Sequence, residues 1–239
     1  MSMLGRFLEV SIHCPDVLES LRFYESIGFS QAPVGETWKH PYAVVTDGRL
    51  SLGLHAYEFV SPSLTWVQPD LRRHAPLLES AGIEFEFLKL GDESFNELGF
   101  LSPEGQMITL LEARTYSPVA RRATDTSMLD WFEEMLLPCR DAAASVAFWE
   151  RLGFVAAEES DRPVPHVGLT SDSLNVALTT HSSVTEPLLV FRTGEPAARR
   201  ERLGAAGIAA ARLPRGLDPG RDLLLRAPEG TGLLMLADD

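Results

Sequence analysis

The sequence has few cysteines, no long apolar run and a shortage of basic residues. Cys14 and Cys139 are the only cysteines among 239 residues, which is too few for a disulfide framework and gives no CxxC-type metal spacing. No stretch approaches the roughly 18 apolar residues of a membrane span, and the first 30 residues have no long apolar run behind a basic start. We therefore expect a soluble cytoplasmic protein.

Basic residues are scarce relative to acidic ones. The chain has 21 Lys and Arg against 34 Asp and Glu, which gives a formal net charge of −13 at pH 7. Such a surface repels nucleic acid and anionic membrane, so we expect neither as a partner. The partner that we expect is a small-molecule ligand, bound by a monomer or a homodimer. The ordinary hydrophobic share of 45% excludes disordered and fibrous classes.

One heptapeptide occurs in two similar copies. "FYESIGF" at 23–29 and "FWERLGF" at 148–154 lie 125 residues apart. The same shift relates Glu9 to Glu134, Cys14 to Cys139, Asp16 to Asp141, Asp47 to Asp172, and "SPEG" at 102–105 to "APEG" at 227–230. So many matches at one spacing indicate duplication of a whole domain. We predict an N-terminal domain at 1–113, a linker at 114–128 and a C-terminal domain at 129–239.

A shorter period divides each copy again. "YESIGF" at 24–29 is echoed by "LESAGI" at 78–83, so the chain reads as four units of roughly 55 residues. In the first unit, "FLEVSIH" alternates as a strand does, and Asp16 is placed to cap a helix that ends at Gly28. Asp47-Gly48 is a strong hairpin signal between two further strands. Each unit is therefore predicted to be βαβββ.

The capped helix ending in "FYxxxGF", the "PEG" turn before a last strand and the four βαβββ units resemble the vicinal oxygen chelate superfamily. This superfamily includes glyoxalase I, bleomycin resistance proteins and extradiol dioxygenases. The resemblance implies an α+β fold of two tandem glyoxalase-like domains with cup-shaped mixed sheets. It also implies that the cup binds a small molecule and, in most members, a divalent metal.

The metal-ligand positions of the superfamily are poorly filled in this sequence. The first ligand lies seven residues before the helix-capping acid, and a last-strand Glu lies four residues after the Gly of the "PEG" turn. These positions hold Glu9, Ser63 and Thr109 in the first domain, and Glu134, Leu188 and Leu234 in the second. Because a stable site normally needs three or more ligands, we predict no metal cofactor. The alternative is a divalent ion such as Zn, Ni, Fe or Mn held by Glu9 and His55.

The first interpretation of function is a metal-independent small-molecule-binding protein of the bleomycin-resistance type, with its ligand in the cup. The residues predicted to contact that ligand are Glu9, Ser11, Tyr42, His55, Ser63, Trp66 and Thr109, with Trp38 and Phe100 as further lining. Glu9 and Glu134 are possible general bases, because a carboxylate in an apolar cup has a raised pKa. We expect the open pocket in the first domain, where Ser63 and Thr109 replace Leu188 and Leu234.

The sequence is compatible with an enzyme as well as with a binding protein. The alternative function is a glyoxalase-like lyase or isomerase, or a dioxygenase-like metalloenzyme, that uses a divalent metal near Glu9 and His55. Bound metal and turnover would separate these alternatives from a binding protein.

Overall fold

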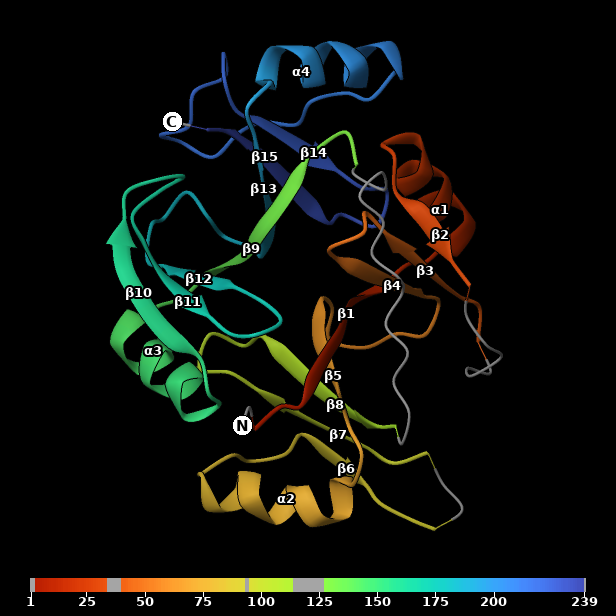
Figure 1. Cartoon of the computed structure of the whole chain (residues 1–239), viewed down its shortest axis with the longest axis vertical. Helices are drawn as coiled ribbons and strands as arrows, with labels where there is room; N and C mark the ends of the chain where they lie inside the picture. Colours follow the sequence, from red (N-terminus) through yellow and green to blue (C-terminus); the bar gives the residue numbers. More distant parts are fainter. Residues whose placement is uncertain (1–2, 34–39, 93–94, 114–126, 239) are drawn as a thin grey trace.

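The protein folds as two mixed β-sheets with four helices, as seen in a computed structural model that describes residues 3–33, 40–92, 95–113 and 127–238 (Figure 1). One sheet has eight strands and the other has seven. The predicted α+β architecture of tandem glyoxalase-like domains is confirmed. Each of the four described helices has ten residues, and none of them could span a bilayer.

The first sheet contains the first two units of the chain. The first unit is β1 (Arg6–His13), α1 (Val17–Ser26), β2 (Ser30–Ala32), β3 (Tyr42–Thr46) and β4 (Ser51–His55). The second unit is β5 (Ser63–Gln68), α2 (Leu71–Ser80), β6 (Phe87–Lys89), β7 (Glu97–Leu101) and β8 (Met107–Glu112). The strand order is β2-β3-β4-β1-β5-β8-β7-β6, with β1 and β5 antiparallel at the centre. Neighbouring units therefore pair to form one sheet.

The second sheet repeats this pattern with one strand fewer. The third unit is β9 (Trp131–Pro138), α3 (Ala142–Arg151), β10 (Val155–Ser160), β11 (His166–Thr170) and β12 (Val176–Thr179). The fourth unit is β13 (Leu188–Thr193), α4 (Pro196–Ala205), β14 (Leu223–Arg226) and β15 (Gly232–Ala237). The predicted first strand after α4 is absent from this described segment. A single bridge from Ala211 to Leu224 replaces it, because Pro214 and Pro219 interrupt the backbone donors that a strand requires.

The helix boundaries follow the local sequence signals. Asp16 accepts hydrogen bonds from the backbone N–H groups of Leu18 and Glu19, and Asp141 accepts one from Ala144 in the equivalent helix. Gly28 follows α1 with φ of +92°, a conformation that costs glycine least. These features let each helix end sharply and the chain return to the sheet.

The two sheets share one large apolar core to which all four helices contribute. Several polar contacts cross from one predicted domain to the other, and two of them lie at equivalent positions. The Tyr24 hydroxyl donates to Glu229 over 2.7 Å, and Nε1 of Trp149 donates to Glu104 over 2.7 Å. The repeated helix ending and the repeated "PEG" turn are therefore mutual partners, each reaching across to the other half.

The division into domains stays a prediction. The sheets occupy residues on either side of the predicted linker 114–128, of which all but 127 and 128 fall outside the described residues. The last described part of that linker packs against the first half of the chain, where Met128 N–H donates to the Ile27 carbonyl over 2.8 Å.

Candidate functional site

The candidate site lies on the inner face of the first sheet, where β1 presents Glu9 and Ser11. Val10 and Ile12 point to the opposite face and belong to the apolar core. The pairing of β1 with β5 shifts register between Phe7 and Glu9, so a bulge precedes the carboxylate. Bulges of this kind re-aim a side chain next to a functional site. Glu9 is nevertheless only 3% exposed, so its charge needs partners.

Three side chains place donors on the Glu9 carboxylate. Ser11 Oγ donates to Oε1 over 2.9 Å, and the Tyr42 hydroxyl donates to Oε2 over 2.9 Å. Nε2 of His55 lies 3.2 Å from Oε1. Glu9, Ser11, Tyr42 and His55 were all predicted as ligand-binding residues, and the fold brings them together from β1, β3 and β4.

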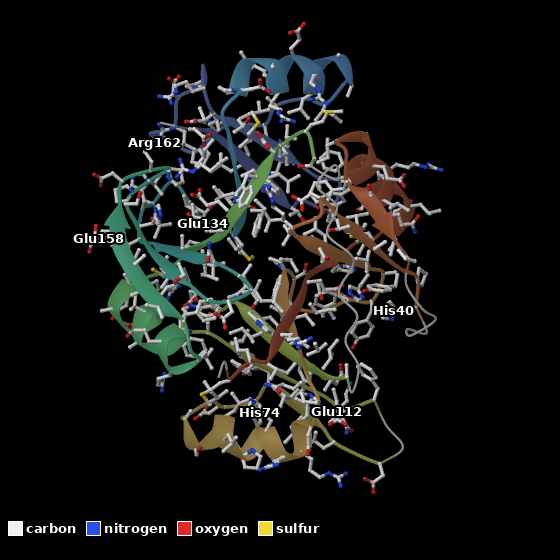
Figure 2. All side chains as sticks on the ribbon, viewed as in Figure 1. His40, His74, Glu112, Glu134, Glu158 and Arg162 are labelled. Atoms are coloured by element: carbon white, nitrogen blue, oxygen red, sulfur yellow. The ribbon has the colours of Figure 1, made fainter. Side chains whose placement is uncertain are left out.

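His40 extends this group toward the mouth of the cup. Its Nε2 lies 3.1 Å from Nδ1 of His55, so both ring nitrogens of His55 have partners. In the tautomer in which Nε2 of His55 donates to Glu9, Nδ1 of His55 accepts from His40. Burial, followed by the neighbouring His55, lowers the pKa of His40. Figure 2 shows His40 beside the strands of the first sheet.

Aromatic rings border the two histidines. Tyr42 packs on His55 with ring centroids 4.4 Å apart, and Phe59 meets His55 edge-on at 5.6 Å. The ring centroids of Tyr57 and His40 lie 5.6 Å apart, and Tyr57 is 60% exposed. His40, Tyr57 and Phe59 were not predicted from the sequence, because they lie in or beside loops whose course hydrophobic periodicity does not predict.

Hydroxyl groups continue the polar face across β5 and β8. Ser11 and Thr65 share a hydrogen bond of 2.8 Å, and Ser63 and Thr109 share another of 2.8 Å. Ser63 and Thr109 were predicted for this face. Thr65 was missed, although strict alternation from Ser63 along the strand identifies it.

Two predicted ligand-binding aromatics belong instead to the core. Trp66 is 1% exposed and packs against Phe7 with ring centroids 5.1 Å apart. Phe100 is fully buried and packs against Phe148 of α3. Both predictions are wrong for the same reason: each residue follows a cup-facing position along its strand and so points to the other face. Trp38 lies outside the described residues.

Glu134 has one histidine partner, His166, at the equivalent place in the second sheet (Figure 2). Oε1 of Glu134 lies 3.5 Å from Nε2 of His166, and both residues are buried. Nδ1 of His166 must donate to the Val164 carbonyl, 2.9 Å away, so Nε2 of a neutral ring is an acceptor. Burial, with the charge of Glu133 second, raises the pKa of Glu134 to about 7. When Glu134 is protonated, its carboxyl group therefore faces a hydrogen-bond acceptor, Nε2 of His166.

The remainder of this second inner face is apolar. Counterparts of the hydroxyl-bearing residues Ser11, Ser63, Thr65 and Thr109 are Leu136, Leu188, Val190 and Leu234, which form a separate buried cluster. A cavity of about 550 Å³ nonetheless opens in this half of the chain, lined partly by Leu188 and Leu224. Our expectation of the open pocket in the first domain does not match this cavity, because loop 209–222 forms a wall beside the second sheet and leaves an open space there.

The Glu9–His55 pair fits two positions of a metal site. Ligand atoms bound at about 2.0–2.2 Å to one divalent ion lie roughly 3 Å apart, as Oε1 of Glu9 and Nε2 of His55 do. An ion on Nε2 would require the tautomer in which Nδ1–H of His55 donates to His40, and His40 would then be the outer partner that orients a metal-binding histidine. Within the described residues, no three His, Cys, Asp or Glu side chains converge, so the pair leaves the other coordination positions open.

Neither cysteine adds to the chemistry of this site. Cys14 lies directly behind it, with its N–H donating to the His55 carbonyl over 2.7 Å. Burial raises the pKa of the Cys14 thiol to about 12 and also raises the pKa of the Cys139 thiol. A thiolate nucleophile or ligand is therefore disfavoured at both positions.

No family model and no curated protein matches the sequence. Solved structures do match. A variant of homoprotocatechuate 2,3-dioxygenase from Brevibacterium fuscum superimposes with a TM-score of 0.67 and 16% identity, over 100% of this chain and 72% of that one. The enzyme of the same name from Arthrobacter globiformis gives 0.65 and 16%, over 99% and 80%. A catechol 2,3-dioxygenase gives 0.61 and 14%, over 99% and 88%.

These matches correct two predictions. The interpretation as a metal-independent binding protein without a cofactor is contradicted, because the solved structures that share this fold are those of ring-cleaving dioxygenases. It rested on counting ligands at superfamily positions. His55 lies two residues beyond the expected strand position and was therefore kept only as the alternative ligand beside Glu9, where folding brings the two side chains within 3.2 Å of each other.

Proposed function

We propose that this chain, whose fold is that of the vicinal oxygen chelate superfamily, is a metal-dependent enzyme of the dioxygenase type with its active site in the first sheet. The observation that supports this most directly is the buried approach of Glu9 to His55 at 3.2 Å, with His40 behind His55. A carboxylate and an imidazole are ligands that suit iron and related divalent ions. The second sheet lacks the hydroxyl groups that surround this pair.

In this proposal Glu9 and His55 hold the ion, and the positions that they leave open are available to substrate oxygen atoms. When bound, the ion supplies Lewis acidity toward those oxygen atoms and access to dioxygen chemistry. Tyr42 and Ser11 keep the Glu9 carboxylate in one orientation. His40 fixes the ring of His55, so the pair is preorganised before ligands arrive.

The substrate class that we propose is a small hydroxylated aromatic compound. Tyr57 presents a 60% exposed ring beside His40, and aromatic rings favour offset or edge-on contact with another ring. Ser63 and Thr109 offer hydroxyl groups on the same inner face. The fold is similar to that of enzymes named for catechol and homoprotocatechuate, which agrees with this class. We favour the dioxygenase-like form over a glyoxalase-like one for this reason.

We also propose a cytoplasmic location and no partnership with nucleic acid or membrane. Cys14 and Cys139 are both free thiols, as is usual in a reducing compartment. The net charge of −13 opposes binding to polyanions.

The test is oxygen consumption by protein reconstituted anaerobically with ferrous iron and then mixed with catechol or homoprotocatechuate in air. We expect ring cleavage, seen as oxygen uptake together with a new absorbing product. Glu9→Gln and His55→Ala should each lower the rate by at least about tenfold, because each removes a ligand. Glu158→Gln is the matched control, since Glu158 is exposed at the edge of the other sheet (Figure 2). Oxygen uptake that is absent, or equal in all four proteins, would contradict the proposal.

A further inference from the structure

Loop 209–222, which stands in place of a strand in the fourth unit, forms one wall of an open cavity against the second sheet. The cavity has a volume of about 550 Å³, within the range of small-molecule sites. Its apolar lining includes Val184, Leu188, Leu213 and Leu224, which belong to or pack against the second apolar cluster. The cavity therefore has a surface able to receive an apolar chain or ring.

The rim of this cavity is positively charged, unlike the protein as a whole. Arg212, Arg215 and Arg226 line it, against one acidic side chain, Glu186. Arg226 is already engaged, because it pairs with Glu186 and donates to the Gly230 carbonyl. Of the described residues, none forms a hydrogen bond or ion pair with the side chain of Arg212 or Arg215. Two guanidinium groups are thus left for a ligand.

The loop that carries these arginines is anchored at both sides. Ala211 N–H donates to the Leu224 carbonyl over 2.7 Å, and Ser183 Oγ donates to the Arg215 carbonyl over 3.2 Å. Leu213 and Leu217 pack on the apolar cluster below. The backbone that carries Arg212 and Arg215 is therefore anchored to the sheet, and both residues lie beside the apolar lining of the cavity.

We propose that this cavity binds a small organic carboxylate, with its carboxylate on Arg212 and Arg215 and its apolar part against Leu188 and Leu224. The planar guanidinium group matches a carboxylate with two parallel hydrogen bonds, which a chloride ion or a neutral group does not reproduce. The apolar lining selects ligands with a hydrocarbon part over inorganic anions. This site is separate from the Glu9–His55 pair and does not depend on the function proposed for it.

The test uses hexanoate as the probe, with hexanamide and inorganic phosphate as comparisons, followed by calorimetry and by NMR of leucine methyl groups. We expect saturable hexanoate binding that shifts the methyl signals of Leu188 and Leu224 and weakens with added salt, since exposed charges are screened. The double variant Arg212→Gln/Arg215→Gln should bind at least about tenfold more weakly. Arg221→Gln is the control, because Arg221 is an exposed arginine of the same loop that does not line the cavity.

Three outcomes would overturn the proposal. The first is no saturable binding of hexanoate to the wild-type protein. The second is equal hexanoate affinity in the wild-type protein and the double variant, with thermal unfolding used to verify that both are folded. The third is phosphate or hexanamide binding as tightly as hexanoate. Phosphate lacks the apolar chain and hexanamide lacks the carboxylate, so equal affinity would mean that the site does not recognise both groups.

Discussion

The carboxylate of Glu9 occupies the space that a side chain at residue 53 would fill. A Cβ atom built on Gly53 would lie 1.9 Å from Oε1 of Glu9, and Gly53 pairs with Ser11 on the adjacent strand. The equivalent position of the second sheet is Ala177, and there Glu134 meets His166 instead. Gly53 therefore allows Glu9 to lie flat against β4, close to His55.

Gly53→Ala should displace the Glu9 carboxylate without removing it. We expect at least about a tenfold loss of turnover, because misplaced groups at a reacting centre are costly. The free energy of unfolding should also fall, by about 1–3 kcal/mol, because the displaced carboxylate is buried and loses hydrogen bonds from its partners. Gly168→Ala is the control, because its new Cβ would meet only Ala157 at 3.6 Å. Unchanged turnover in Gly53→Ala would mean that the position of Glu9 does not matter.

The buried Glu134 should make the protein less stable at high pH. Its pKa is raised from 4.5 to about 7, so the folded state holds this proton more tightly than the unfolded state does. The resulting contribution to the free energy of unfolding is complete below pH 4.5 and is lost as the pH rises through 7. Glu134→Gln keeps a neutral side chain at all pH values. We expect this variant to be more stable at pH 8 than the wild-type protein, by on the order of 2–3 kcal/mol. Urea unfolding at pH 5 and pH 8 measures this, and equal pH dependence in both proteins contradicts it.

The contact between Tyr24 and Glu229 should stabilise the association of the two halves of the chain. Tyr24 is fully buried, and its hydroxyl donates to a carboxylate. Tyr24→Phe should lower the free energy of unfolding by about 1.5–3 kcal/mol, the range for hydrogen bonds to charged groups. Ser26→Ala is the comparison, because Ser26 is exposed and bonds only within its own helix end. Denaturant unfolding that gives equal losses for both variants would argue against this role.

The fold was predictable because its signals are local and repeated. The capping acids Asp16 and Asp141 both act as N-caps, and Gly28 and Gly48 both have the positive φ expected of them. Alternation in β1 correctly placed Glu9 and Ser11 on one face. One error concerns the segment after α4. A strand was predicted there because the other units have one at that position, but this proline-containing segment forms only a bridge.

The site was predictable only in part, because its contacts join loops and strands far apart in the sequence. His55 was assigned to the cup from strand parity, and Tyr42 as one of several aromatic residues expected to line it. The contacts of His40 with His55 and of His166 with Glu134 were missed, since loop conformation sets them. The prediction of no metal cofactor rested on a ligand count at fixed superfamily positions, and the matches to solved dioxygenase structures contradict it.

Trp66 and Tyr57 should respond to substitution in opposite ways. Trp66→Leu opens a space in the core and should lower the free energy of unfolding by about 2–4 kcal/mol, with little effect on substrate affinity. Tyr57→Ala should change stability by less than about 0.5 kcal/mol, because the ring is 60% exposed, yet raise KM for an aromatic substrate. Paired unfolding and kinetic measurements decide this. A raised KM in Trp66→Leu but not in Tyr57→Ala would reverse the assignment.

The most direct test of the account is the metal content of the purified protein. Protein produced with added iron, manganese, nickel and zinc is desalted and measured by elemental analysis, beside Glu9→Gln and His55→Ala. The account predicts close to one divalent ion per wild-type chain and a large loss in each variant, because both side chains contact the ion. Wild-type protein that holds no ion, or variants that retain as much as the wild type, would contradict it.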